Sequence, residues 1–179
     1  MRPSSALTAA LTTTAAAALT VTGAAAAPAA GTSAGASARP SVCQEQSLSV
    51  SASSGGQRNM ARIAVTNRGG VTCVVDRVPT VTFRGLDGSA AAVPPATSGP
   101  YVLSPGERGY AAVRTAAPGA TEGHVVRSLS VAADPSHHGV TFGAATVGMG
   151  RGIQVWEPVT TLWHPSRAAA DRALENATR

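Results

Sequence analysis

Three of the four histidines lie between positions 124 and 138, and imidazole is the side chain that most often binds transition metals. His137 and His138 are adjacent, Asp134 precedes them, and His124 is nearby in the chain. A zinc site needs several ligands that converge on one point, whereas neighbouring side chains in a strand point to opposite faces. Residues 134–136 are typical of a turn. We therefore expect an exposed loop here, with a weak metal site at Asp134, His137 and His138 as an alternative.

Hydrolytic chemistry is the next class to consider. A serine hydrolase needs a serine on a sharp turn with a histidine and an acid within reach, and serines are too numerous here to single out a triad. Glu107 and Glu157 could be the paired carboxylates of a glycosidase. However, Glu107 belongs to a Ser-Pro-Gly-Glu turn, where a solvated side chain is expected. We predict no catalytic residue and no cofactor, and keep a secreted hydrolase as the alternative function.

A glycine-rich stretch surrounds Met149 and Arg151, with glycines at 143, 148, 150 and 152. A phosphate-binding loop would precede a helix, but a strand pattern follows, which favours a hairpin loop. Arg151, Trp156 and Trp163 form the predicted binding surface, because arginine and tryptophan are common anchors at interfaces. The alternative is that Trp156 lies in the core and Trp163 covers its edge.

The first residues are typical of a secretory signal peptide. Arg2 precedes an uncharged apolar run over residues 6–21, and small residues at 24–26 suit a signal peptidase. The run is weak for a membrane anchor, since it consists mainly of alanine, leucine and threonine. We therefore predict a signal peptide over 1–26, no stable membrane insertion after its removal, and a secreted, extracellular location that includes association with the cell wall.

The chain contains two cysteines, Cys43 and Cys73. Cysteines of an exported protein can pair and stay paired, and two cysteines allow one internal connectivity. We predict the disulfide Cys43–Cys73; two free thiols or an intermolecular bridge are the alternatives. A bond closing a loop of this length stabilises a fold by about 3–4 kcal/mol in the chain-entropy model.

The charge balance is basic, with 14 arginines, no lysine and 9 acids, which gives a net charge of +5. Nucleic-acid binding usually needs clustered basic residues interleaved with aromatic ones. The arginines here are scattered and aromatic residues make up only 3% of the chain, so no nucleic-acid partner is expected.

Apolar residues alternate with polar ones over much of the chain after residue 42, which is the strand period. Clear examples are residues 48–52, 61–65, 81–83 and 153–157, separated by glycine-, asparagine- and proline-containing turns. We predict an all-β domain over 42–163, an antiparallel β-sandwich of seven to nine strands, with a closed barrel as the alternative. Residues 27–41 are predicted to be a flexible linker. Residues 164–179 form a C-terminal tail that is either a short helix capped by Ser166 or frayed.

Several motifs resemble a secreted actinobacterial family of domains of unknown function found in Streptomyces and its relatives. They are Cys43, Asn67-Arg68-Gly69, Cys73, Pro79 and Leu103-Ser104-Pro105-Gly106, and the resemblance covers about 42–163. A glycine that commonly stands two positions before the proline is Arg77 here. The resemblance implies an immunoglobulin-like sandwich and an exported or surface-attached location, and carries no assigned activity.

Together these patterns favour a secreted, non-enzymatic β-sandwich that acts as a binding module at the cell surface or outside the cell. The expected partner is a protein or a cell-wall glycan. The two alternatives are the secreted hydrolase and an exported metal-binding protein.

Overall fold

The computed structural model describes residues 40–178, which form twelve strands, a short 3-10 helix and one C-terminal α-helix. The predicted signal peptide (1–26) and nearly all of the predicted linker (27–41) lie outside the described residues. In chain order the elements are the 3-10 helix Glu45–Ser47, β1 Leu48–Ser54, β2 Met60–Asn67, β3 Cys73–Asp76, β4 Thr80–Phe83, β5 Ala91–Val93, β6 Pro100–Leu103, β7 Arg108–Arg114, β8 His124–Val126, β9 Ser128–Ala132, β10 Val140–Gly143, β11 Ile153–Val155, β12 Val159–Thr161 and α1 Arg167–Ala177.

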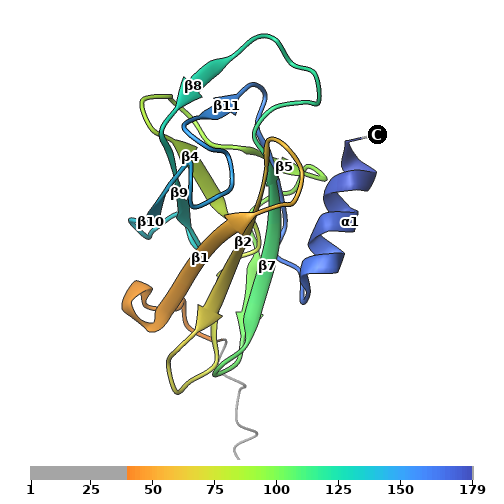
Figure 1. Ribbon diagram of the computed structural model, residues 1–179. Coiled ribbons are helices and arrows are strands. Elements are labelled where there is room, and N and C mark those ends of the chain that lie inside the picture. The colour runs from red at the N-terminus through yellow and green to blue at the C-terminus, as the bar shows by residue number, and fades with distance from the viewer. Residues whose placement is uncertain (1–39, 179) are drawn as a thin grey trace, which may run out of the picture. The chain divides into compact units, whose positions relative to one another are not determined.

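The largest sheet has five strands in the order β1-β2-β7-β12-β5. It contains the three longest strands, β1, β2 and β7, which Figure 1 shows running alongside one another, with β1 at one edge of the sheet and β7 in the middle. β1 and β2 form an antiparallel hairpin whose register runs from Leu48↔Asn67 to Ser54↔Ala61. The alternation of apolar residues in this part of the sequence predicted both strands.

One pairing in this sheet contradicts the predicted all-antiparallel arrangement. β12 pairs in parallel with β5, with Val159 opposite Ala91 and Thr161 opposite Val93. A parallel pair needs a long connection between its strands, and most of the domain lies between β5 and β12 in sequence. Local turn chemistry could not reveal this pairing, because no turn joins the two strands.

Three smaller sheets complete the described part of the chain, with the strand orders β10-β9-β4, β11-β8 and β3-β6. The twelve strands exceed the predicted seven to nine, and β5, β8, β11 and β12 contain only three residues each. Three residues seldom show an alternating pattern; of these four strands, β11 was among the clear examples in the sequence, although it ends at Val155 and not at residue 157. The distribution over four sheets also argues against the alternative of one closed barrel.

The main core lies on one face of the five-stranded sheet. Ala61, Ile63 and Val65 of β2 point into it and are at most 1% exposed. They belong to one buried cluster with Val81 of β4 and Leu129 of β9. Side chains at every second position of a strand share a face, so the intervening residues of β2 lie on the opposite face of the sheet.

α1 covers that second face. Ala170 and Leu174 of α1 form a separate buried cluster with Met60 of β2 and Ala112 of β7, and Figure 1 shows α1 beside β7. The hydroxyl oxygen of Ser166 accepts a hydrogen bond from the backbone N–H of Ala169, as expected for an N-cap. The sequence allowed either a short helix or a frayed tail over residues 164–179, and the structure contains the helix.

Two side-chain contacts hold α1 against the sheet. The guanidinium of Arg62 donates to both carboxylate oxygens of Asp171 at 3.0 Å, and Arg167 lies over the ring of Tyr110 at 5.8 Å. A peptide of 11 residues is a marginal helix alone, so this packing accounts for much of its stability. Within residues 40–178, no helix combines the length and the apolar character needed to cross a membrane.

The predicted disulfide between Cys43 and Cys73 is confirmed, with a Cα–Cα distance of 4.9 Å. It fastens the start of the domain to β3, and both cysteines are buried. The backbone N–H of Cys43 donates to the carbonyl of Val74, and the N–H of Val74 donates to the carbonyl of Ser41. The segment before β1 is thus held by a covalent bond and by two backbone hydrogen bonds.

Candidate functional site

The residues considered for metal binding do not converge. The carboxylate of Asp134 accepts hydrogen bonds from the hydroxyl and the backbone N–H of Ser136. The Nε2 atom of His137 lies 3.0 Å from the carbonyl oxygen of Cys43, whereas His138 contacts Glu45 through Nδ1 at 3.3 Å. No group of three histidine, cysteine, aspartate or glutamate side chains in residues 40–178 is placed to hold a metal ion.

These side chains instead join the start of the domain to the turn before β10. The carboxylate of Glu45 accepts hydrogen bonds from the backbone N–H groups of Gly139, at 2.8 Å, and His138, at 3.2 Å. The hydrogen bond from Gly139, followed by that from His138, lowers the pKa of Glu45 from its ordinary value of 4.5. The ionised carboxylate therefore stabilises the folded state.

Acid is expected to weaken this contact. Because the pKa of Glu45 is lower in the folded than in the unfolded protein, its contribution is complete above pH 4.5 and is lost as the pH falls through the folded value. Between about pH 5 and pH 3, we expect the thermal midpoint of the wild-type protein to fall more steeply than the thermal midpoint of Glu45→Gln. If the thermal midpoints of the two proteins fall equally with pH, the ionised carboxylate of Glu45 does not stabilise the fold.

The carboxylates considered for a glycosidase lie at opposite ends of β7. Glu107 directly precedes β7, whose last residue, Arg114, pairs with Val159, two residues after Glu157. A strand of seven residues is about 23 Å long, whereas the two carboxylates of a glycosidase are within about 10 Å of each other. Glu107 instead accepts a hydrogen bond from the backbone N–H of Ser104 in its own turn. These two residues therefore do not form one site.

The predicted surface of Arg151, Trp156 and Trp163 is not formed as one patch. Trp163 is only 4% exposed and belongs to the main core, whereas Trp156 is 39% exposed. Arg151 precedes β11 and Trp156 follows it, and Arg151 lines a separate hollow near Arg127. The alternative was also wrong, because it placed Trp156 in the core and Trp163 at its edge. Trp156 alone keeps the role of a candidate binding residue.

Trp156 lines a pocket of about 340 Å³ where the ends of three sheets meet. One wall is the β4–β5 loop, the second is the start of β8, and the third is the segment that joins β11 to β12. The lining residues are Phe83, Leu86, Asp87, Gly88, Ser89, His124, Val155, Trp156, Glu157 and Pro158. We call this hollow the Trp156 pocket.

Local backbone geometry shapes the wall that carries Trp156. Its N–H donates to the carbonyl of Thr115 at 2.8 Å, which fixes the chain directly after β11. Gly123 faces this segment with a φ of +114°, and a Cβ atom there would collide with the carbonyl oxygen of Val155. Glu157 also has a positive φ, 48°, which is uncommon for a residue with a side chain. Strained positions of this kind often occur at functional sites.

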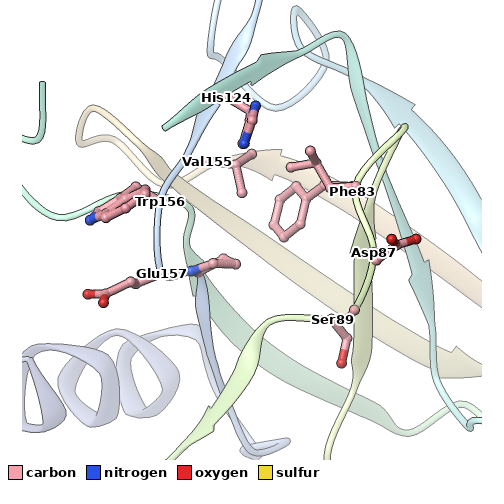
Figure 2. A pocket seen from close by; sticks show the side chains of 10 residues that line it. Phe83, Asp87, Ser89, His124, Val155, Trp156 and Glu157 are labelled. Carbon is pink, nitrogen blue, oxygen red and sulfur yellow. The ribbon is translucent and has the colours of Figure 1, made fainter. Parts of the chain in front are cut away.

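The pocket combines an apolar floor with a polar rim. Phe83 and Val155 are nearly buried, and Figure 2 shows their side chains directed toward the middle of the pocket. The carboxylates of Asp87 and Glu157 point away on opposite sides in Figure 2, so they do not form a catalytic pair. Ligand pockets typically have this composition, with apolar contact area and a few polar groups that set orientation.

Sequence reasoning missed most of this pocket. Phe83 was predicted only as part of a strand, His124 only as a neighbour of the other histidines, and Asp87 and Ser89 were not considered. The pocket draws on three segments that are far apart in sequence, 83–89, 124 and 155–158. The glycines at 85 and 88 with Asp87 mark an exposed turn, but nothing local indicates that this turn lies near Trp156.

Sequence reasoning also did not use a Gly-x-Ser-x-Gly pattern at residues 31–35. This pattern lies in the predicted linker and outside the described residues. A serine nucleophile in such a motif requires a strand before it and a helix after it, whereas the sequence here is rich in alanine, glycine and serine.

Comparison with known proteins identifies the domain but not its activity. No curated protein and no solved structure matches the chain. Residues 43–163 match the family described as "Domain of unknown function (DUF4232)". This match covers most of the chain and ends just before α1. The protein therefore belongs to the DUF4232 family of domains of unknown function.

Proposed function

We propose that the protein is an exported, non-enzymatic binding module that holds a cell-wall glycan in the Trp156 pocket. The observation that carries this proposal is the position of Trp156, an exposed tryptophan on the wall of a concave pocket with an apolar floor. An indole ring offers a flat apolar face and a donor N–H, which suits ligands that are partly apolar and partly polar. A sugar ring has both kinds of surface.

The charges around the pocket favour an uncharged partner over an anionic one. Asp87 and Glu157 both line it, and ionised carboxylates only accept hydrogen bonds. Both carboxylates point away from the middle of the pocket, but their negative charges at its rim repel phosphate or carboxylate groups. The basic net charge of the chain therefore does not define the ligand of this pocket.

Two further expectations belong to this proposal. Export is supported by the disulfide Cys43–Cys73, because disulfides persist mainly in oxidising compartments. An immunoglobulin-like sandwich is supported by the main core, which joins β2 and β7 of the five-stranded sheet to β4 and β9 of a second sheet.

Replacing Trp156 is expected to weaken attachment to the cell wall. Walls from the producing organism would be stripped of protein by protease and incubated with the purified domain, and the bound fraction measured by sedimentation. Trp156→Ala is expected to raise the apparent Kd about tenfold or more, since tryptophans central to an interface contribute about 2 kcal/mol or more. Arg151→Ala is the matched control, because Arg151 is exposed but lies outside the pocket.

Two outcomes would contradict the proposal. Equal binding by wild type and Trp156→Ala would remove the Trp156 pocket as the site. Binding that disappears when the walls are stripped of protein would indicate a protein partner instead of a glycan. The thermal midpoint of each variant shows whether a change in binding reflects unfolding.

A further inference from the structure

A row of hydroxyl side chains crosses the three-stranded sheet and leads to the Trp156 pocket. Ser130 of β9 lies opposite Thr82 of β4 on one side and Thr141 of β10 on the other. Thr82 in turn forms a bridge with Ser89, which lines the Trp156 pocket. Ser89, Thr82, Ser130 and Thr141 therefore lie side by side across neighbouring backbone segments, and each carries a hydroxyl group. We call these four residues the hydroxyl row.

The hydroxyl row lies on the solvent side of this sheet. The neighbouring positions Val81, Leu129 and Val131 are fully buried in the main core, and side chains alternate between the two faces of a strand. Thr141 and Ser89 are exposed, and Thr82 and Ser130 are half-buried. The hydroxyls of Ser130 and Thr141 lie 2.8 Å apart and can still bond to a ligand, since each hydroxyl has one donor and two acceptor positions.

A second hollow joins the hydroxyl row to the pocket. It measures about 460 Å³ and is lined by Thr82, Ser130 and Thr141 of the row. It shares four lining residues with the Trp156 pocket, namely Phe83, Leu86, Asp87 and Gly88. The two hollows therefore adjoin along the β4–β5 loop, one presenting an aromatic ring and the other presenting hydroxyls.

We propose that this combined surface binds an extended chain of β-linked, N-acetylated sugars, with its end in the Trp156 pocket. This inference rests on the proposed function and adds the length and chemistry of the ligand. Neighbouring strands are about 4.8 Å apart, so the hydroxyl row spans about 14 Å, which is enough to contact several successive sugar rings. The apolar floor of Phe83 and Val155 suits the methyl group of an acetamide.

Isothermal titration with soluble oligomers of β-1,4-linked N-acetylglucosamine, from one to five units, tests the inference. Affinity is expected to rise with each unit up to about four and then level off, as the row is filled. Thr82→Val/Ser130→Ala/Thr141→Val is expected to lose about tenfold in affinity for the tetramer and less than about twofold for the monomer, since each net hydrogen bond contributes modestly. Ser51→Ala/Ser53→Ala is the matched control, because these exposed serines lie on β1, outside both hollows.

Each contrary result has a distinct meaning. No binding of any oligomer, or equal affinity for monomer and tetramer, would overturn the extended site. Unchanged tetramer affinity in the triple variant would overturn the role of the hydroxyl row. If Trp156→Ala nevertheless loses attachment to protein-free cell walls, the proposed function stands and only this inference fails. If Trp156→Ala binds the walls as well as the wild type does, the proposed function fails too.

Discussion

Replacing Cys43 and Cys73 together by alanine is expected to lower the free energy of unfolding by about 3–4 kcal/mol. The disulfide closes a loop with a sequence separation of 30, and its loss lets the unfolded chain adopt more conformations. A typical domain has a total stability of about 5–15 kcal/mol, so the change is a large share. Urea unfolding of the wild type and the double variant measures it.

Alanine is the appropriate replacement because both cysteines are buried, and serine would add two buried hydroxyls. Wild-type protein unfolded in the presence of a reducing agent provides a second estimate of the same loss. A difference below about 1 kcal/mol in both experiments would show that the backbone hydrogen bonds of Cys43 and Val74 suffice to hold this segment.

Asn67→Ala is expected to destabilise the fold by about 3 kcal/mol, because it removes several hydrogen bonds from a buried position. The side-chain amide donates to the carbonyls of Val71 and Leu103, and its oxygen accepts from the N–H of Gly69. Asn67 and Leu103 are both fully buried, so the carbonyl of Leu103 in particular would lose its hydrogen-bond partner without access to water. Urea unfolding reports the change.

Asn67→Asp gives a sharper test of the same interactions. It keeps the acceptor for Gly69 but places a carboxylate against the carbonyl oxygens of Val71 and Leu103, so it is expected to be more destabilising than Asn67→Ala at neutral pH. Arg68→Ala is the control, and as an exposed neighbour it is expected to change stability by less than about 0.5 kcal/mol. An Asn67→Asp variant as stable as the wild type would contradict the hydrogen-bond assignment.

Features that depend on local residue patterns were predictable. The alternation of Ala61, Ile63 and Val65 predicted β2 and its core face, because the strand period places every second residue on one side. Asn67 and Gly69 predicted the turn after it, since their side-chain and backbone chemistry suits a turn. The disulfide followed from the inferred compartment and the presence of two cysteines.

Features that depend on contacts between distant segments were not predictable. Trp156 and Trp163 both follow apolar stretches, yet Trp163 is buried and Trp156 is exposed. The parallel pairing of β5 with β12 and the Trp156 pocket likewise join segments with no turn between them. A single sequence contains no local pattern that indicates such contacts between distant segments.

The most direct test of the account is the response of the two tryptophan indole N–H signals to a ligand in NMR. The chain has two tryptophans, one exposed on the wall of the pocket and one buried in the core. Titration with N-acetylglucosamine tetramer is expected to shift the Trp156 signal, with that of Trp163 unchanged. Wall fragments that bind the protein while leaving the Trp156 signal in place would contradict the central claim that this pocket is the binding site.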